Sequence, residues 1–121
     1  MTRGELGRRA ELAVADMVFA LGFDIIDRNV RLGPLEIDIV ARKGALVIAV
    51  EVRTRGTGSL VGAFESVTRR KRRRLIRATR RLWNERLATE DTVERMRIDV
   101  AAVQFIRRET VVDYAEGAIG G

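Results

Sequence analysis

The chain has 121 residues, a length typical of one domain, and carries a net charge of +6 with a sequence pI near 11.1. It contains no cysteine and no histidine, which excludes disulfides, structural zinc, Cys or His nucleophiles and histidine acid–base chemistry. Any bound metal would need oxygen ligands, which favours magnesium, manganese or calcium. The positive charge favours an anionic partner: nucleic acid first, and an anionic membrane surface second.

The predicted elements follow the order helix, three strands, helix, strand. Apolar side chains recur at helical spacing between residues 4 and 21, and Gly22 supplies a stop signal. The patterns that follow predict strands over 23–32, 35–42 and 45–55, a loop at 56–59, a helix from 62 or 63 to 86, a polar loop at 89–94, a strand over 97–106 and a short edge strand over 110–114. We therefore predict one α/β domain over residues 1–114, with an antiparallel meander at its centre, and a flexible tail over 115–121.

The sequence also predicts where the protein works. No apolar stretch reaches the roughly 20 residues that are needed to span a bilayer. The first nine residues are polar, and no signal-peptide core follows them. We therefore expect a cytoplasmic protein with no membrane partner.

Two of the predicted strands carry carboxylates inside apolar runs. A turn at Lys43-Gly44 would pair Arg42 with Ala45, which places Glu36 opposite Glu51 and Asp38 diagonal to it. All three acids then share one face, with Asp38 and Glu51 roughly 7–8 Å apart at Cα. A divalent cation between them would turn their repulsion into a binding site. The alternative is that nearby arginines pair with these acids, which would then only specify the fold.

Several motifs resemble those of a known family. Asp38, a turn and then Glu51-Val52-Arg53 resemble the PD-(D/E)XK motif of restriction-endonuclease-like nucleases. More narrowly, the chain resembles the YraN-like family, an uncharacterised bacterial group of that superfamily. The resemblance covers roughly residues 4 to 104, and its matching stretches are 7–13 with Glu11, 29–31, 36–40, 50–55, 65–67 with Lys71, and 97–100. It implies a restriction-endonuclease-like α/β fold, with a central mixed sheet flanked by helices, and kinship with archaeal Holliday-junction resolvases.

The resemblance also implies a set of site residues. Asp38 and Glu51 would bind Mg²⁺ or Mn²⁺ with the help of the Val52 carbonyl, and Glu11 would reach the site from the first helix. Position 53 departs from the family pattern, which usually has lysine where this chain has Arg53. Arginine stays charged and cannot act as a base, but it could hold the scissile phosphate or stabilise developing charge.

The second predicted helix is strongly basic on one side. Its apolar face would contain Phe64, Val67, Leu75, Ala78 and Leu82, while the opposite arc contains Arg69, Arg70, Arg73, Arg74, Arg77, Arg80 and Arg81. Acids are nearly absent from that arc, which favours anion binding over a merely solvated surface. We include Arg55 and Lys71 among the candidate nucleic-acid contacts. Lys71 falls on the apolar side, so either its amine extends out to solvent or it points into the acidic site.

These observations lead to one expected function and two alternatives. We expect a metal-dependent, structure-specific DNA endonuclease that hydrolyses phosphodiester bonds, acting on branched or junction DNA and as a homodimer. Glu11, Asp38, Glu51 and Arg53 would form its catalytic site. The first alternative is a non-catalytic nucleic-acid-binding module on the same fold, which the arginine at position 53 favours. The second is an adaptor that uses the arginine helix on an acidic protein.

Overall fold

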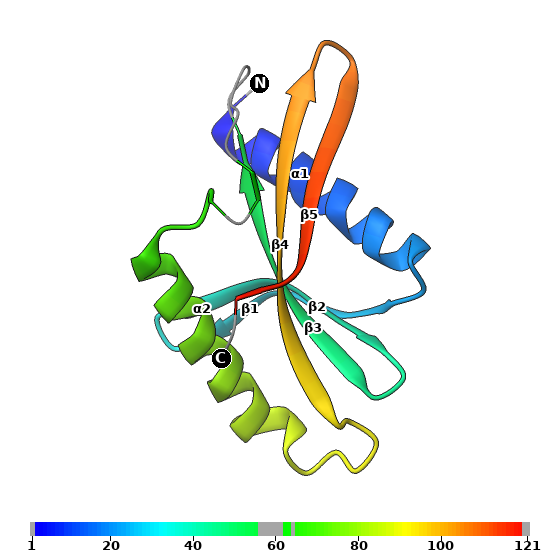
Figure 1. Ribbon diagram of the computed structural model, residues 1–121, viewed down its shortest axis with the longest axis vertical. Coiled ribbons are helices and arrows are strands. Elements are labelled where there is room, and N and C mark those ends of the chain that lie inside the picture. Colours follow the sequence, from blue (N-terminus) through cyan, green and yellow to red (C-terminus); the bar gives the residue numbers. More distant parts are fainter. Residues whose placement is uncertain (1, 56–61, 64, 120–121) are drawn as a thin grey trace.

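The computed structural model describes residues 2–55, 62–63 and 65–119. Its elements run α-β-β-β-α-β-β along the chain (Figure 1). They are α1 (Arg3–Ala20), β1 (Asp24–Leu32), β2 (Leu35–Lys43), β3 (Leu46–Thr54), α2 (Arg69–Leu82), a π-helical turn (Trp83–Leu87), β4 (Arg95–Ile106) and β5 (Glu109–Ile119). The fold is thus the predicted mixed α/β architecture, a sheet flanked by helices.

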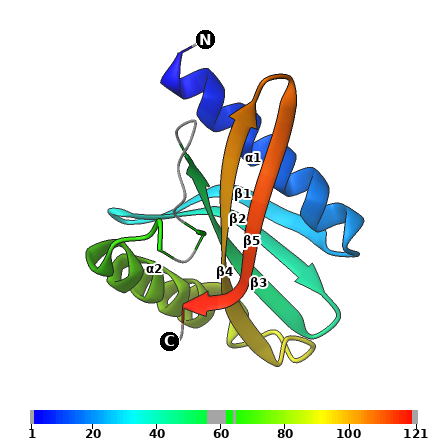
Figure 2. The same cartoon turned by 45° about the horizontal axis from the view of Figure 1, so that its top comes forward.

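The five strands form one sheet in the order β1-β2-β3-β4-β5. The first three form the predicted antiparallel meander, β3 and β4 are parallel, and β5 returns antiparallel to β4. The parallel step requires a crossover, and α2 lies within it. The two helices cover opposite faces of the sheet (Figure 2). None of the helices in the described part of the chain is long and apolar enough to cross a membrane.

The helix α1 begins where the sequence predicts. The hydroxyl of Thr2 accepts a hydrogen bond from the backbone N–H of Glu5 at 3.2 Å, which caps the first turn. The side chains of Ala10, Val14 and Val18 are fully buried at helical spacing and pack on the β2, β3 and β4 residues of one sheet face. Helix periodicity alone therefore located this element to within one residue at each end.

The β2–β3 register differs from the prediction by two residues. Lys43 pairs with Leu46, so Gly44 and Ala45 form the turn instead of Lys43 and Gly44. Gly44 has φ 60°, a conformation that glycine adopts without a Cβ penalty. Because side chains alternate between faces along a strand, a shift of two residues changes each partner but keeps every side chain on its predicted face.

The second helix is shorter at its start than predicted. Residues 62–63 and 65–67 form turns, and α2 begins only after Thr68, whose hydroxyl accepts from the N–H of Lys71 at 3.2 Å. Ala63 and Val67 are nevertheless buried, so their apolar spacing reflects packing of the turns and not a helix. Phe64 lies outside the described residues. At its other end the helix continues as the π-helical turn to Leu87.

The C-terminal segment is a strand where we predicted a tail. β5 continues beyond Tyr114 to Ile119, which is buried with Val100 and Ala102 of β4. The buried carboxylate of Asp99 holds this segment, since it accepts hydrogen bonds from the N–H of Gly117 at 2.8 Å and from the hydroxyl of Tyr114. Arg97 completes the network with two hydrogen bonds to the same carboxylate. The small residues that suggested a loose end instead allow close packing against β4.

Candidate functional site

Asp38 and Glu51 lie together where the paired part of β2 and β3 ends. The last ladder pair is Ile39 with Val50, and the two acids are the next residues outward on each strand. Their carboxyl groups share a hydrogen bond. One oxygen of Asp38 also accepts a hydrogen bond from the backbone N–H of Val52 at 2.8 Å. The structure therefore brings the two predicted ligands into direct contact on one face of adjacent antiparallel strands.

Burial makes this pair electrostatically unusual. Glu51 is only 4% exposed, and its desolvation, with the nearby charge of Asp38, raises its pKa to about 8. Desolvation also raises the pKa of Asp38, against the opposing effect of the Val52 N–H. At neutral pH the pair therefore holds one proton between two carboxyl groups. Removing that proton leaves two negative charges, one on the buried Glu51 and one on the half-buried Asp38, an arrangement that a cation would stabilise.

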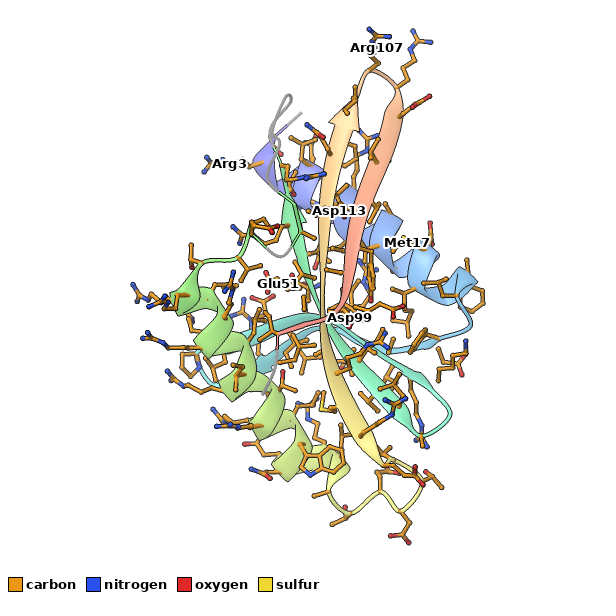
Figure 3. All side chains as sticks on the ribbon, viewed as in Figure 1. Arg3, Met17, Glu51, Asp99, Arg107 and Asp113 are labelled. Carbon is orange, nitrogen blue, oxygen red and sulfur yellow. The ribbon has the colours of Figure 1, made fainter. Side chains whose placement is uncertain are left out.

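Lys71 supplies a cation at this pair. Its Nζ lies 3.8 Å from Oε1 of Glu51, and the Lys71 charge lowers the pKa of that carboxyl. The residue belongs to the first turn of α2, and its side chain is 36% exposed. Of the two orientations left open by the sequence, the structure has the one that points into the acidic site. Figure 3 shows Glu51 between the sheet and the start of α2.

Arg53 and Glu11 act on the site from a greater distance. The charge of Arg53, two residues along β3 from Glu51, lowers the pKa of that carboxyl. Glu11 is partly buried on α1, and desolvation together with the charge of Asp38 raises its pKa. Nothing in the described residues joins Glu11 to either acid of the pair by a hydrogen bond. Glu11 therefore shares the electrostatic field of the site and not its contacts.

The oxygen donors present fit a hard divalent cation. The N–H of Val52 points towards β2, and the C=O of a strand residue points the same way as its N–H, so this carbonyl lies on the side of Asp38. Two carboxylates and a carbonyl are donors that magnesium and manganese prefer. In the described part of the chain, no three acidic side chains gather closely enough to hold a metal alone. A cation here would thus also need water or substrate oxygen, as magnesium sites commonly do.

The arginines of α2 form a basic surface next to the acid pair. All seven predicted residues of this arc are exposed: Arg69, Arg70, Arg73, Arg74, Arg77, Arg80 and Arg81. Four of them line a groove of about 370 Å³ beside the β1–β2 turn, namely Arg70, Arg73, Arg74 and Arg77. The guanidinium group of Arg81 already has partners within the protein, since it donates a hydrogen bond to the Leu32 carbonyl and forms an ion pair with Glu85. We call the seven exposed arginines the α2 arginine surface.

Arg55 lies apart from this surface. Its side chain is only 12% exposed, and its guanidinium is 3.9 Å from the carboxylate of Asp113 on β5. Its backbone N–H donates to the Val103 carbonyl, which extends the β3–β4 ladder. Arg55 thus forms an ion pair within the protein, apart from the exposed arginines of α2, and its contact with nucleic acid stays a prediction.

Two further charged residues act on the site, and sequence reasoning missed one of them. Arg28 of β1 lowers the pKa of Glu11, and Glu36 raises the pKa of both Glu11 and Asp38. Glu36 was predicted on the same face as Asp38 and Glu51, since it lies two residues from Asp38 on the same strand. Arg28 carried no such signal, because a register irregularity between Ile25 and Asp27 determines where β1 side chains point.

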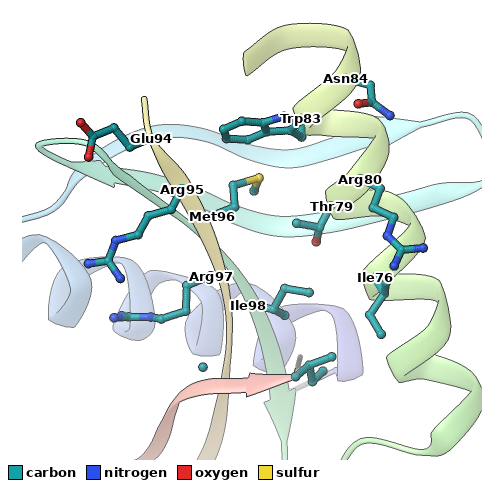
Figure 4. Close-up of a pocket in the computed structure, with 12 residues that line it drawn as sticks. Ile76, Thr79, Arg80, Trp83, Asn84, Glu94, Arg95, Met96, Arg97 and Ile98 are labelled. Atoms are coloured by element: carbon teal, nitrogen blue, oxygen red, sulfur yellow. The ribbon is translucent and has the colours of Figure 1, made fainter. Parts of the chain in front are cut away.

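A pocket of about 670 Å³ lies elsewhere, between the end of α2 and β4 (Figure 4). Trp83 and Met96 are on its walls, while the side chains of Arg95 and Arg97 extend to the far side of β4. No residue of the acid pair lines it. Its lining mixes apolar residues with polar ones such as Arg80 and Asn84 and contains one acid, Glu94. The two carboxyl groups in contact lie at Asp38 and Glu51, so we place the candidate site there and not in this pocket.

Comparison with known proteins places the chain in a family. The sequence pattern of Uncharacterised protein family UPF0102 matches residues 10–103. The chain belongs to this family. A UPF0102 protein of Sorangium cellulosum is 50% identical over 104 residues, which cover 86% of this chain and 72% of that protein. UPF0102 proteins of Moorella thermoacetica and Anaeromyxobacter dehalogenans are 40% and 36% identical, each over 98% of this chain and over 98% and 87% of their own lengths.

The UPF0102 match includes every residue of the candidate site. It begins at Ala10, one residue before Glu11, and ends at Val103, where β3 and β4 cease to pair. The acid pair, Lys71 and α2 all lie inside it. The names of these relatives state no activity, so a function for the family has to be argued from the geometry of the site.

Proposed function

We propose that this UPF0102 protein is a metal-dependent, structure-specific DNA endonuclease that hydrolyses phosphodiester bonds. One observation carries the proposal: the Lys71 amine lies 3.8 Å from the buried Glu51, whose carboxyl group contacts that of Asp38. The family motif places a lysine on the strand, where this chain has Arg53. A lysine that arrives from α2 supplies the same type of group at the same acids. A purely structural ion pair would not require two carboxylates that share a proton.

The residues of the site divide the chemistry between them. Asp38, Glu51 and the Val52 carbonyl would hold Mg²⁺ or Mn²⁺, with Glu11 contributing through water. Such an ion, when bound, supplies Lewis-acid polarisation of the phosphate and lowers the pKa of water. Lys71 donates hydrogen bonds to a phosphate oxygen and stabilises the charge that develops there. Arg53, which stays protonated, adds fixed positive charge and cannot accept a proton.

The α2 arginine surface would bind the DNA backbone. The exposed guanidinium groups follow one side of the helix and line a groove, an arrangement that matches a row of phosphates. Because each neutralised phosphate releases condensed counterions, affinity should fall steeply with salt. Replacing Arg73, Arg77 and Arg80 together by alanine should flatten the log–log salt slope by about 3. An unchanged slope would mean that DNA binds to another surface of the protein.

The deciding experiment is a cleavage panel. Duplex, flap and four-way-junction DNA are incubated with the protein and Mg²⁺, Mn²⁺ or EDTA. We expect cutting of at least one branched substrate with metal and none in EDTA. Asp38→Asn should abolish it while DNA binding persists, and Asp16→Asn, at an exposed acid of α1, is the matched control that keeps activity. Cutting two strands calls for two sites, so we also propose a homodimer, testable by analytical ultracentrifugation with and without DNA.

A second candidate function is a nucleic-acid-binding module without catalysis. The observation that favours it is the arginine at position 53, together with only two acids in direct contact in the described site. The two functions separate in the cleavage panel. If the wild type and Arg53→Lys both bind DNA and neither cuts any substrate with either metal, the binding module is the better description.

A further inference from the structure

A second basic feature lies away from the acid pair and from α2. Strands β4 and β5 form a hairpin whose two-residue turn is Arg107-Arg108, between the paired residues Ile106 and Glu109. Figure 3 shows Arg107 at the far tip of this hairpin, beyond α1 and the rest of the sheet. We propose that this tip enters the major groove of a duplex arm of the DNA. The inference rests on the proposed function and assigns it a second contact surface.

The hairpin projects because its neighbour strand ends first. The last β3–β4 ladder pair is Thr54 with Val103, and beyond it β4 pairs only with β5 among the described residues. Arg107 is the fourth residue after Val103. At about 3.3 Å per residue the tip stands roughly 13 Å beyond that pair. This length suffices for a side chain at the tip to reach the floor of a groove roughly 8.5 Å deep.

The root of the hairpin is held firmly. The guanidinium of Arg9 lies over the ring of Phe105, 4.9 Å from its centroid, and Phe105 packs against the α1 face of the core. Val103 and Gln104 are buried. The projection is therefore a paired ribbon with a packed root, which limits the entropy lost when it is placed in a groove.

The side chains of the tip are free of polar contacts to the described residues. Ile106, Arg107 and Arg108 are exposed, and in the described part of the chain the side chains of the two arginines make no hydrogen bond or ion pair. Glu109 is the adjacent acid, so the turn remains net positive. Two exposed guanidinium groups at the end of a paired β-ribbon match the phosphates and guanine edges of duplex DNA.

The backbone of the turn gives independent support. Arg107 has φ 59°, in the left-handed region that disfavours side chains. The other two hairpins of the sheet place glycine in this conformation, Gly33 at φ 66° and Gly44 at φ 60°. Only the projecting hairpin has a long cationic side chain there. Strain that persists at an exposed position is expected where the side chain serves a function.

The geometry selects double-stranded DNA over other anions. A two-stranded β-ribbon fits the major groove, which is about 12 Å wide. A membrane surface would require an apolar face, and the exposed apolar side chains at the tip are limited to Ile106 and the more distant Val111. The hairpin and the α2 arginine surface belong to separate elements, so together they can contact two duplex segments on either side of one site.

The proposal can be tested with variants that separate stability from binding. Arg107→Gly removes the charge and relieves the backbone, so its melting temperature should equal or exceed that of the wild type. Its affinity for a four-way junction in EDTA, measured by fluorescence anisotropy, should fall about 5-fold, with a salt slope lower by about 1. In the double variant Arg107→Gly/Arg108→Gln the salt slope should be lower by about twice as much. The matched control is Arg95→Gln, an exposed arginine at the opposite end of β4, which should bind as the wild type does.

A second measurement locates the contact. The chain has no cysteine, so R107C labelled with iron–EDTA carries the reagent at one place only. We expect hydroxyl-radical cuts confined to one duplex arm, on either side of the major groove. Uniform cutting, cuts centred on the minor groove, or unchanged affinity of the Arg107→Gly variant would overturn the inference. If the Arg107→Gly variant binds as the wild type does but the triple alanine variant of Arg73, Arg77 and Arg80 loses affinity, the proposed function stands and only the role of the hairpin is refuted. If the wild type binds no DNA, both the proposed function and this inference are refuted.

Discussion

Replacing Glu51 by glutamine should stabilise the metal-free protein at alkaline pH. The pKa of this glutamate rises from 4.5 to about 8 because the folded protein buries it beside Asp38. Between these two values the folded state holds a proton that the unfolded state releases. Stability therefore falls as pH rises through this window, and the full cost of Glu51 is present above pH 8. Glutamine has no such cost, and its amide can still donate a hydrogen bond to Asp38.

The size of the effect follows from the same shift. At about 1.36 kcal/mol per pKa unit, a rise from 4.5 to about 8 corresponds to roughly 5 kcal/mol above pH 8. This is an upper limit, because water that penetrates a buried site reduces the penalty. We expect Glu51→Gln to gain about 2 to 5 kcal/mol in unfolding free energy at pH 8.5, and close to nothing at pH 4.5.

The assay is urea denaturation in EDTA at pH 4.5, 6.5 and 8.5. Glu90→Gln, which changes an exposed glutamate in the loop before β4, is the control and should follow the wild type at each pH. A Glu51→Gln variant whose stability changes with pH as the wild type does would refute the reasoning. That result would mean that Glu51 is ionised in the folded protein at neutral pH.

Three further predictions concern the site and its support. Lys71→Met should lower the single-turnover cleavage rate by about 100-fold while DNA affinity falls less than 3-fold. Adding Arg53→Lys to this variant should restore part of the cleavage rate, and full activity of Lys71→Met would contradict the proposed role. Asp99→Asn should lower the free energy of unfolding, measured by urea denaturation, by about 3 kcal/mol because Arg97 loses its buried partner. Tyr114→Phe should lower it by about 1 kcal/mol, and equal losses for the two variants would argue against this network. Mg²⁺ should raise the melting temperature more at pH 8 than at pH 6, because binding must displace the proton of the acid pair; a pH-independent rise would count against a metal there.

The order and type of the elements were predictable because most of them bury one face. Apolar runs marked β2 and β3, alternation in the sequence marked β4, and helical spacing marked α1. The start of α2 was not predictable from spacing, since Ala63 and Val67 are buried in turns that imitate a helical face. The length of β5 was missed for a related reason. Its end is held by Asp99, a residue far away in sequence, and not by an apolar pattern of its own.

The acid pair was predictable from the alternation of side chains along a strand, even though the predicted turn was incorrect. A register error of two residues changes partners, but Asp38 and Glu51 stay on one face either way. The position of Lys71 was not predictable, because it depends on how α2 docks onto the sheet. The projecting hairpin was equally hidden: the sequence contains Arg107-Arg108, but only the unequal lengths of β3 and β4 show that this turn stands clear of the sheet.

Lys71 belongs to the same helix as the α2 arginine surface, and this placement has a mechanical consequence. A cation at position 53 would keep a distance to Glu51 that is set by two residues of one strand. Lys71 keeps its 3.8 Å only while α2 holds its place over the sheet. A polyanion that bound the exposed arginines and shifted α2 would therefore change the distance between Lys71 and Glu51. Because the Lys71 charge lowers the pKa of Glu51, such binding would also change the acidity of that carboxyl.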